Sequence, residues 1–288
     1  MNVHISRLVI VGTGLIGGSF AATLKQADLV DEIVGLGRRR ETLEQARALG
    51  LIDAIAESPA QVAGADVVML ATPMAQMPRV LKEIAPHLGE NTIVTDAGST
   101  KCDVIAAARK ALGANFARFV PGHPIAGAES NGPQAARADL FIGRNVVLCP
   151  EPETDAAAVR RVTALWQATG AQVLQMGADR HDRIFAAVSH LPHLAAFALV
   201  DELAARPDAE DFFCFAASGF RDFTRIAGSS PELWRDVALA NRTALLSELA
   251  TYQDKLDEIR QALDAEDAAA LEKIFSRASA ARRDWGRE

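Results

Sequence analysis

Residues 8–19 read LVIVGTGLIGGS, a β-branched run that leads into three spaced glycines. Gly12 would let the chain turn sharply off a strand, Gly14 would let the backbone approach a ligand, and Gly17 would let a helix pack closely on a sheet. N–H groups at the start of such a helix bind phosphate. An ordinary glycine-rich turn is the alternative, but the strand before and the helix after favour a dinucleotide site. The residues predicted to hold the pyrophosphate are Gly12, Thr13, Gly14, Leu15, Ile16 and Gly17.

Strand and helix signals alternate through the first part of the chain, and helix signals alone follow. The strand-like runs lie at residues 8–11, 33–35, 67–71, 92–95, 119–121, 146–149 and 173–175. Such alternation indicates crossover connections and a mostly parallel sheet. We therefore expect an α/β protein, with an N-terminal Rossmann-type dinucleotide-binding domain over residues 1–177 and an all-helical substrate and dimerisation domain over residues 178–288.

An apolar stripe near the C-terminus has the spacing of a helix-packing seam. Its members are Leu245, Leu249, Tyr252, Leu256, Ile259 and Leu263. This seam is longer than a small domain needs for its own core, so it predicts packing against a second copy of the chain. We expect a homodimer formed through the helical domain.

The composition excludes several classes of function. The chain has 288 residues, 49% of them hydrophobic, and a net charge of −7. This charge argues against binding to nucleic acids, because phosphate backbones require a basic surface. No apolar run is long enough to predict a membrane span, and the first residues lack a secretion signal. Three widely separated cysteines indicate reduced thiols in a cytoplasmic protein, with neither disulfides nor a thiolate metal site.

The end of the second predicted strand bears on the choice of dinucleotide. An NAD site carries an acidic residue there, which accepts a hydrogen bond from the ribose 2′-hydroxyl. This chain instead has Gly37 followed by Arg38, Arg39 and Arg40. A glycine makes room for the 2′-phosphate of NADP, and guanidinium groups bind it. A solvated basic patch is the alternative, and we expect NADP in preference to NAD.

Polar groups follow two more strand ends and a later loop. Thr72 and Pro73 come after the 67–71 run and should line the cofactor site, because ligands bind at the carboxyl ends of parallel strands. Ser99, in the segment DAGSTK of residues 96–101, either bonds a substrate or caps a helix, and in isolation the cap is favoured. His123, in the segment GHPIAG of residues 122–127, is an imidazole suited to act as a general base.

The helical half contributes histidines and arginines. His181, His190 and His193 lie on one predicted helix without the spacing of zinc ligands, so we predict no metal site. Pro192 removes a backbone donor and should break this helix, so that His193 points into a cleft. In the segment GFRDFTRIA of residues 219–227, an arginine binds a substrate carboxylate or pairs with the aspartate of the same segment.

Five motifs occur in register along the chain. They are GTGLIGGS at residues 12–19, DxGSxK at 96–101, GHPIAG at 122–127, SHLPH at 189–193 and GFRDFTRIA at 219–227. In this order they resemble the prephenate and arogenate dehydrogenase family of tyrosine biosynthesis. The resemblance runs from Leu8 to the helices beyond Trp234.

This resemblance implies roles for the matching residues. His123 matches the family's catalytic histidine, which takes the proton of the ring 4-hydroxyl as hydride leaves the same carbon, and Ser99 matches the serine that helps to orient that hydroxyl. Arg225 matches the arginine that binds substrate carboxylate, and His193 matches a histidine of the same pocket. The positions that match gating and supporting groups are Glu129, Asp182, Asp222 and Trp234.

The implied reaction is NAD(P)-dependent oxidative decarboxylation of prephenate to 4-hydroxyphenylpyruvate, of arogenate to tyrosine, or of both. One alternative is a related NADP-dependent reductase of the pyrroline-carboxylate or β-hydroxyacid type, which would not need the GHPIAG motif. Another is a non-catalytic dinucleotide sensor, which would have no use for His123, His193 and Arg225 around a pocket. We expect no fused chorismate mutase or regulatory domain, so any inhibition by tyrosine would act at the active site.

Overall fold

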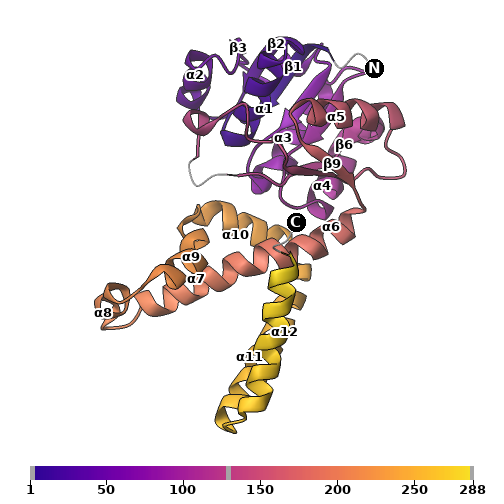
Figure 1. Ribbon diagram of the computed structural model, residues 1–288. Coiled ribbons are helices and arrows are strands. Elements are labelled where there is room, and N and C mark those ends of the chain that lie inside the picture. The colour runs from indigo at the N-terminus through magenta and orange to yellow at the C-terminus, as the bar shows by residue number, and fades with distance from the viewer. Residues whose placement is uncertain (1–3, 128–130, 286–288) are drawn as a thin grey trace. The chain divides into compact units, whose positions relative to one another are not determined.

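The computed structural model describes residues 4–127 and 131–285 (Figure 1). By their contacts, these residues form two compact units, Met1–Arg242 and Thr243–Glu288. The first unit contains every described residue of the candidate site.

A six-stranded parallel sheet forms the centre of the first unit, in the order β3-β2-β1-β4-β5-β6. Its strands are β1 (Ile5–Val11), β2 (Val30–Leu36), β3 (Ala54–Ile55), β4 (Val67–Leu70), β5 (Ile93–Asp96) and β6 (Phe119–Val120). The central strands are buried on both faces, which is why they read as continuous apolar runs. The strand order reverses between β1 and β4, where open α/β sheets form a ligand crevice.

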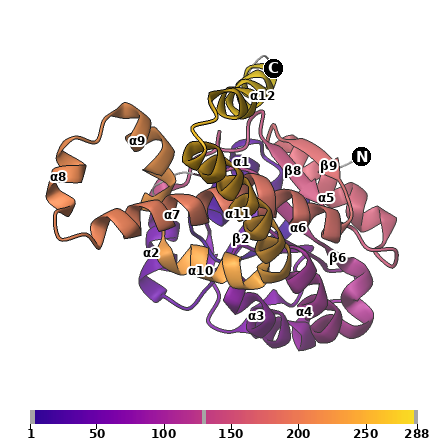
Figure 2. The ribbon, with the colours of Figure 1, turned by 90° about the horizontal axis from the view of Figure 1, so that it is seen from below.

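Helices cover both faces of this sheet. One face carries α1 (Leu15–Gln26), α2 (Arg40–Ala48) and α5 (Ala156–Ala168), and the other carries α3 (Met77–Ile84) and α4 (Cys102–Leu112), which lie side by side (Figure 2). In β1, Leu8 and Ile10 join the first of these two cores, and Val9 and Val11 join the second. Short 3₁₀ turns lie at Pro59–Val62, Met74–Gln76, Ala85–His87, Gly113–Arg118, Pro133–Ala135 and Arg225–Gly228.

A second, three-stranded sheet has the order β7-β8-β9. It consists of β7 (Gly122–Pro124), β8 (Asn145–Leu148) and β9 (Gln172–Gln175), with β7 antiparallel to β8 and β8 parallel to β9. The sequence pattern did not predict β7 or β3. Each has only two or three residues, and β7 reads Gly-His-Pro, which carries no β-branched side chain.

Helices follow β9 to the end of the first unit. They are α6 (Ala178–Phe185), a π-helical segment (Ala186–His190), α7 (Leu191–Ala204), α8 (Ala209–Cys214), α9 (Ser218–Thr224) and α10 (Pro231–Ala240). Pro192 lies in the first turn of α7, directly after the π-helical segment. The predicted interruption is therefore present, as a wide turn within a continuing helix. The fold class expected from the sequence, a Rossmann-type parallel sheet followed by helices, is confirmed.

The stretch Ala178–Ala204 corrects one expectation. By length and composition it is apolar enough to cross a membrane, with a mean hydropathy of 1.5, whereas the sequence was expected to contain no such run. A core helix of a soluble protein passes the same test, and this one buries His181, Asp182 and His190 within the first unit. Only 22% of the apolar window is buried within the described chain.

The second unit consists of α11 (Arg242–Asp264) and α12 (Ala268–Trp285). The predicted stripe lies on α11, where Tyr252, Leu256 and Leu263 remain between 37% and 60% exposed. Helices α6 to α10 belong to the same compact unit as the sheet. The compact units divide after Arg242. The domain boundary at residue 177, which the sequence placed after the last strand, stays a prediction about which part of the chain binds substrate.

Candidate active site

The glycine turn after β1 has the three properties that its sequence predicts. Gly12 has a φ of +100°, and a Cβ there would lie 2.4 Å from the Ala71 carbonyl oxygen. A Cβ on Gly17 would lie 2.1 Å from the Gly12 oxygen, so this glycine allows α1 to approach the sheet. A Cβ on Gly14 would meet nothing within 4 Å. The first and third glycines are thus needed by the fold, whereas the second leaves open space at the start of α1.

A cavity of about 320 Å³ opens at this turn. Of the predicted cofactor residues, it is lined by Gly14, Leu15, Ile16, Thr72 and Pro73. The hydroxyl oxygens of Thr13 and Thr72 are buried, and neither has a hydrogen-bond partner among residues 4–127 and 131–285. Open space at a helix N-terminus beside two unpaired hydroxyls fits the phosphates of a dinucleotide.

A second cavity, of about 200 Å³, lies at the end of β2 and shares Thr72 with the first. Gly37 and Arg38 line it, whereas Arg39 is exposed at the start of α2 and lines neither cavity. Arg40 forms ion pairs with Glu44, at 3.0 Å, and with Glu57, at 2.5 Å. Of the three arginines, Arg38 therefore lines the cavity, Arg39 is exposed, and Arg40 neutralises nearby carboxylates.

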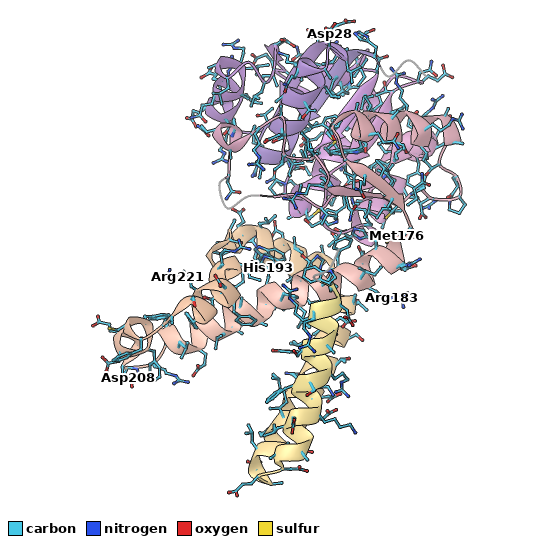
Figure 3. All side chains as sticks on the ribbon, in the orientation of Figure 1. Asp28, Met176, Arg183, His193, Asp208 and Arg221 are labelled. Atoms are coloured by element: carbon cyan, nitrogen blue, oxygen red, sulfur yellow. The ribbon has the colours of Figure 1, made fainter. Side chains whose placement is uncertain are left out.

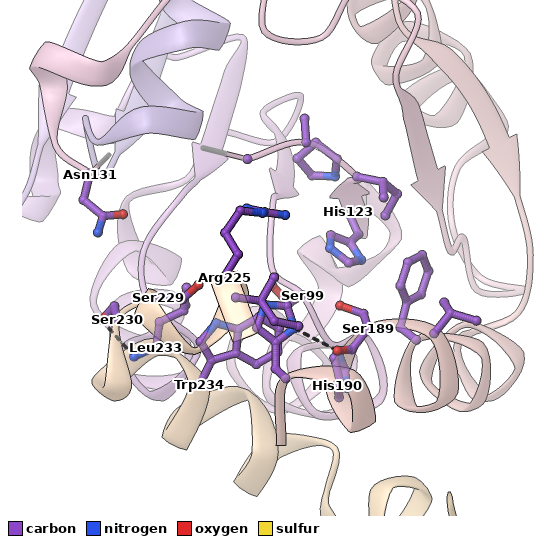
Figure 4. A pocket seen from close by; sticks show the side chains of 18 residues that line it. Ser99, His123, Asn131, Ser189, His190, Arg225, Ser229, Ser230, Leu233 and Trp234 are labelled. Carbon is purple, nitrogen blue, oxygen red and sulfur yellow. Dashed lines mark hydrogen bonds between the residues drawn. The ribbon is translucent and has the colours of Figure 1, made fainter. Parts of the chain in front are cut away.

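A larger cavity, of about 510 Å³, adjoins the first and is lined by the predicted polar residues (Figure 4). Its lining includes Ser99, His123, His193, Arg225 and Trp234. Ser99 and His123 line both cavities, so they lie where the two meet. Figure 4 shows the Arg225 side chain extending toward the part of the cavity where His123 lies.

Glu129 lies outside the described residues. His193 lies on α7 and Arg221 lies on α9 (Figure 3). Arg221 is exposed and does not line the cavity. Within residues 4–127 and 131–285, no ion pair joins Asp222 to Arg221 or Arg225. That alternative for the two arginines therefore receives no support.

A chain of hydrogen bonds extends from His123 into the protein. Nδ1 of His123 lies 2.8 Å from Nε2 of His181, and Nδ1 of His181 lies 2.8 Å from a carboxylate oxygen of Asp182. That carboxylate also accepts from the backbone N–H groups of Lys101, at 2.8 Å, and Cys102, at 2.9 Å. His181 and Asp182 are buried, whereas His123 is half-buried and lines both cavities.

This chain determines which imidazole nitrogens carry protons. A carboxylate accepts hydrogen bonds, so Nδ1 of His181 carries the proton, and a neutral His181 then presents an unprotonated Nε2. Nδ1 of His123 must therefore donate to it, which leaves Nε2 of His123 with a lone pair. An imidazole oriented in this way can accept a proton.

The surroundings keep these imidazoles uncharged. Burial lowers the pKa of His123 well below its usual value, and the neighbouring His181 and Lys101 lower it further. Burial also lowers the pKa of His181, although Asp182 opposes this shift. The pKa of the Asp182 carboxyl is lowered despite its burial, through its hydrogen bonds with His181 and with the backbone of Lys101 and Cys102. His123 is thus a neutral base at neutral pH.

Two further histidines line the cavity. The His193 ring stacks on Trp234 with 3.4 Å between ring centres, and its Nδ1 lies 2.9 Å from the Ser189 carbonyl oxygen. Nδ1 of His193 therefore donates, and its Nε2 is an acceptor. His190 receives a hydrogen bond of 3.1 Å from the Asn241 amide, and burial lowers its pKa to about 4. It is therefore neutral, with the proton on Nε2.

The sequence pattern missed two contributors to this network. His181 was considered only as a possible metal ligand, although an aspartate follows it directly in the sequence. Asn241 donates both to His190 and to the Asp182 carbonyl oxygen, at 2.8 Å, and had no signal of its own. The residues that the structure describes contain no group of three or more potential metal ligands.

Comparison with known proteins identifies the family. The description "Prephenate dehydrogenase, nucleotide-binding domain" matches residues 20–175, and "Prephenate dehydrogenase, dimerization domain" matches residues 177–277. The chain belongs to the prephenate dehydrogenase family. Membership bears out the resemblance and favours neither the reductase nor the sensor alternative.

Individual relatives agree with this assignment. Prephenate dehydrogenase of Bacillus subtilis is 36% identical over 96% of this chain and 76% of the relative. Cyclohexadienyl dehydrogenase of Zymomonas mobilis is 36% identical over 96% of this chain and 94% of the relative. Prephenate dehydrogenase of A. aeolicus, solved in complex with hydroxyphenyl propionate and NAD+, superposes with a TM-score of 0.91 at 35% identity, over 97% of this chain and 98% of the other.

Proposed function

We propose that this chain is an NAD(P)-dependent dehydrogenase of tyrosine biosynthesis that oxidatively decarboxylates prephenate, arogenate or both. The observation that carries the proposal is the position of His123. It lies where the cavity at the glycine turn meets the larger cavity, and its hydrogen bond to His181 leaves one nitrogen able to accept a proton. Family membership supplies the reaction class.

The chemistry divides between cofactor and protein. A bound dinucleotide supplies the acceptor for hydride from C4 of the substrate ring. Nε2 of His123 takes the proton of the 4-hydroxyl, so that C4 becomes a carbonyl carbon. When the ring carboxylate leaves as carbon dioxide, the electrons of the broken C–C bond make the ring aromatic, and the phenolate oxygen takes the proton back. Aromatisation supplies the driving force, so the protein has mainly to position the ring.

Other cavity residues bind and orient the substrate in this proposal. The Ser99 hydroxyl bonds the substrate 4-hydroxyl beside His123, because both residues line the junction of the two cavities. Arg225 and His193 act on the side-chain end of the substrate, where a guanidinium suits a carboxylate. Trp234 fixes the His193 ring by stacking. Glu129 stays a predicted gating residue.

The decisive experiment follows reduced cofactor at 340 nm with prephenate and with arogenate separately, each with NADP and with NAD. Turnover of either substrate supports the proposal. A chain that binds the dinucleotide but turns over neither substrate would instead be a sensor. Turnover confined to β-hydroxyacids would identify a related reductase.

We propose NADP as the preferred cofactor. Gly37 and Arg38 line the cavity at the end of β2, and Arg40 neutralises the Glu57 carboxylate that also lines it, which lowers the repulsion of a 2′-phosphate. Arg39 is close in sequence but lines neither cavity. The Michaelis constants of the native chain and of Arg38→Ala test this preference, with Arg39→Ala as the matched control. A loss of NADP affinity only in Arg38→Ala supports the proposal.

We also propose a cytoplasmic homodimer formed through residues 178–288, the part that we assign to substrate binding and dimerisation. The match to a dimerization domain supports it, as do the exposed apolar side chains of α11 and the largely unburied window of Ala178–Ala204. Sedimentation at micromolar concentration tests the assembly. A monomer would contradict it.

A further inference from the structure

A buried ion pair lies close to the active site but outside the three cavities described above. Nζ of Lys101 lies 2.5 Å from a carboxylate oxygen of Asp96, and both side chains are 0% exposed. Neither residue lines any of the three cavities. A buried ion pair is costly to desolvate and is weak evidence for stability. Its position therefore calls for another explanation.

The pair binds the backbone immediately before each of the two proposed catalytic residues. Asp96 accepts from the N–H of Gly98, at 2.8 Å, and from the N–H of Gly122, at 3.0 Å. Lys101 donates to the Gly122 carbonyl oxygen, at 2.6 Å. Gly98 precedes Ser99, and Gly122 precedes His123. One carboxylate thus connects the loop that carries the serine to the strand that carries the histidine.

The two glycines are needed for this arrangement. A Cβ on Gly98 would lie 2.6 Å from the Met74 sulfur and 2.9 Å from an Asp96 carboxylate oxygen. A Cβ on Gly122 would lie 2.9 Å from the Asp96 carbonyl oxygen. Both backbones therefore approach Asp96 as closely as they do because no side chain intervenes.

Lys101 also reaches His123 by a second route. Its backbone N–H donates to Asp182, which holds His181, which in turn bonds His123. The side chain of Lys101 thus restrains the backbone before His123, and its main chain restrains the partner of the His123 ring. Both routes end on the same imidazole.

We infer that Asp96 and Lys101 are positioning residues that set the distance and orientation between the Ser99 hydroxyl and the His123 imidazole. The inference rests on the proposed function, in which these two groups act on one substrate hydroxyl. A displacement of about 1 Å in a reacting group costs up to about 100-fold in rate. Loss of the pair should therefore reduce kcat more than it weakens binding.

The test replaces both charges at once. In Asp96→Leu/Lys101→Met, no unpaired buried charge remains, so the fold should persist. We expect kcat to fall by about 10- to 100-fold, with Michaelis constants and dinucleotide affinity nearly unchanged. The control is Lys25→Met/Asp53→Leu. It removes a partly exposed ion pair of the same 2.5 Å length in the same unit, and it should leave kcat unchanged.

A second readout does not depend on turnover. Nitrogen NMR of ¹⁵N-histidine-labelled protein, with the His123 signals assigned by His123→Asn, reports the tautomer and hydrogen bonding of that ring. We expect these signals to shift in the double variant and to stay unchanged in the control. If the double variant does not fold, Asp96→Asn/Lys101→Met, which keeps a hydrogen-bond acceptor at residue 96 and leaves no unpaired buried charge, takes its place under the same criteria.

A folded variant with native kcat and an unshifted His123 spectrum would overturn the inference and reduce the pair to a structural role. An equal loss of kcat and of dinucleotide binding would also overturn it, because the damage would then be general. If the native chain turns over neither prephenate nor arogenate, the proposed function fails, while the His123 spectrum still decides whether the pair positions the ring.

Discussion

The two cavities that meet at His123 are built in different ways. The one at the glycine turn has seven glycines and alanines in its lining, among them Gly14 after β1 and Ala71 after β4. The larger one takes its polar side chains from segments that extend from Ser99 to Trp234. The phosphate-binding part of the first depends on the backbone of a single turn and on the absence of side chains, whereas the polar side chains of the second come together from distant parts of the chain. Binding of a common phosphate group can be local, but the chemistry on a particular ring is assembled by tertiary structure.

The largest effect is expected from replacing His123, the proposed proton acceptor. In His123→Asn, the proton acceptor is lost while the size of the side chain is nearly kept. We expect kcat to fall by about 1,000-fold, with little change in either Michaelis constant, as measured by cofactor reduction. His87→Asn, at a histidine outside all three cavities, is the control. Near-normal turnover in His123→Asn would remove the catalytic assignment.

The second prediction concerns pH and the imidazoles at and beside the larger cavity. Burial lowers the pKa of His190 to about 4, and it also lowers the pKa of His123 and His181. The unfolded chain then takes up protons at higher pH than the folded chain, so stability is fully present above about pH 6.5. Between pH 6.5 and 4, His190 alone should cost up to roughly 3 kcal/mol of unfolding free energy.

Urea unfolding from pH 7.5 to 4.5 measures this loss, and His190→Gln should make the dependence shallower. A stability that stays flat over this range would show that the folded and unfolded chains take up protons at the same pH, which contradicts the lowered pKa values of these imidazoles.

The third prediction separates substrate from cofactor binding. Arg225→Ala removes a guanidinium from the larger cavity only, so the substrate Michaelis constant should rise by about 10- to 100-fold, as expected for loss of a charged hydrogen bond. The dinucleotide constant should not change. Arg221→Ala, on the neighbouring helix α9, is the matched control because it lies outside the cavity. An unchanged substrate constant would return Arg225 to a structural role.

The smallest effects are expected at the glycine turn, where two variants separate the role of Gly17 in the fold from the role of Gly14 in binding. Gly17→Ala should destabilise the fold by about 1–3 kcal/mol, because its Cβ would overlap the Gly12 oxygen. Gly14→Ala should leave the melting temperature unchanged, since its Cβ meets nothing, yet weaken dinucleotide binding several-fold. Thermal unfolding and cofactor titration of both variants distinguish these outcomes. Equal destabilisation would show that Gly14 also serves the fold.

The sequence predicts the local features of this molecule better than those that depend on contacts between distant residues. The glycine turn could be predicted with its three roles, because each role depends on residues a few positions apart. Strands β1, β2, β4 and β5 could also be predicted, since burial on both faces makes them continuous apolar runs. Strand β7 could not, because Gly122-His123-Pro124 pairs with β8 through tertiary context rather than through intrinsic preference.

The cavity residues show a similar limit. His123, Ser99, His193 and Arg225 were selected through motif resemblance, and the structure brings all four to one cavity. The bond between His123 and His181, 58 residues apart, has no sequence signature. Nor do the hydrogen bonds of Asp96 to Gly98 and Gly122, because nothing in the pattern shows that the carboxylate is buried.

The π-helical segment Ala186–His190 affects the directions in which the histidines before and after it project from the helix. Twelve residues separate His181 from His193, and in an uninterrupted α-helix they would project about 120° apart around the axis. A single π turn absorbs one residue, which leaves the equivalent of about three full turns and brings the two imidazoles to nearly the same side. Deleting Ala187 should therefore restore a regular α-helix in which His181 and His193 still project to nearly the same side. The π turn thus accommodates one extra residue without changing the directions of the histidines on either side of it.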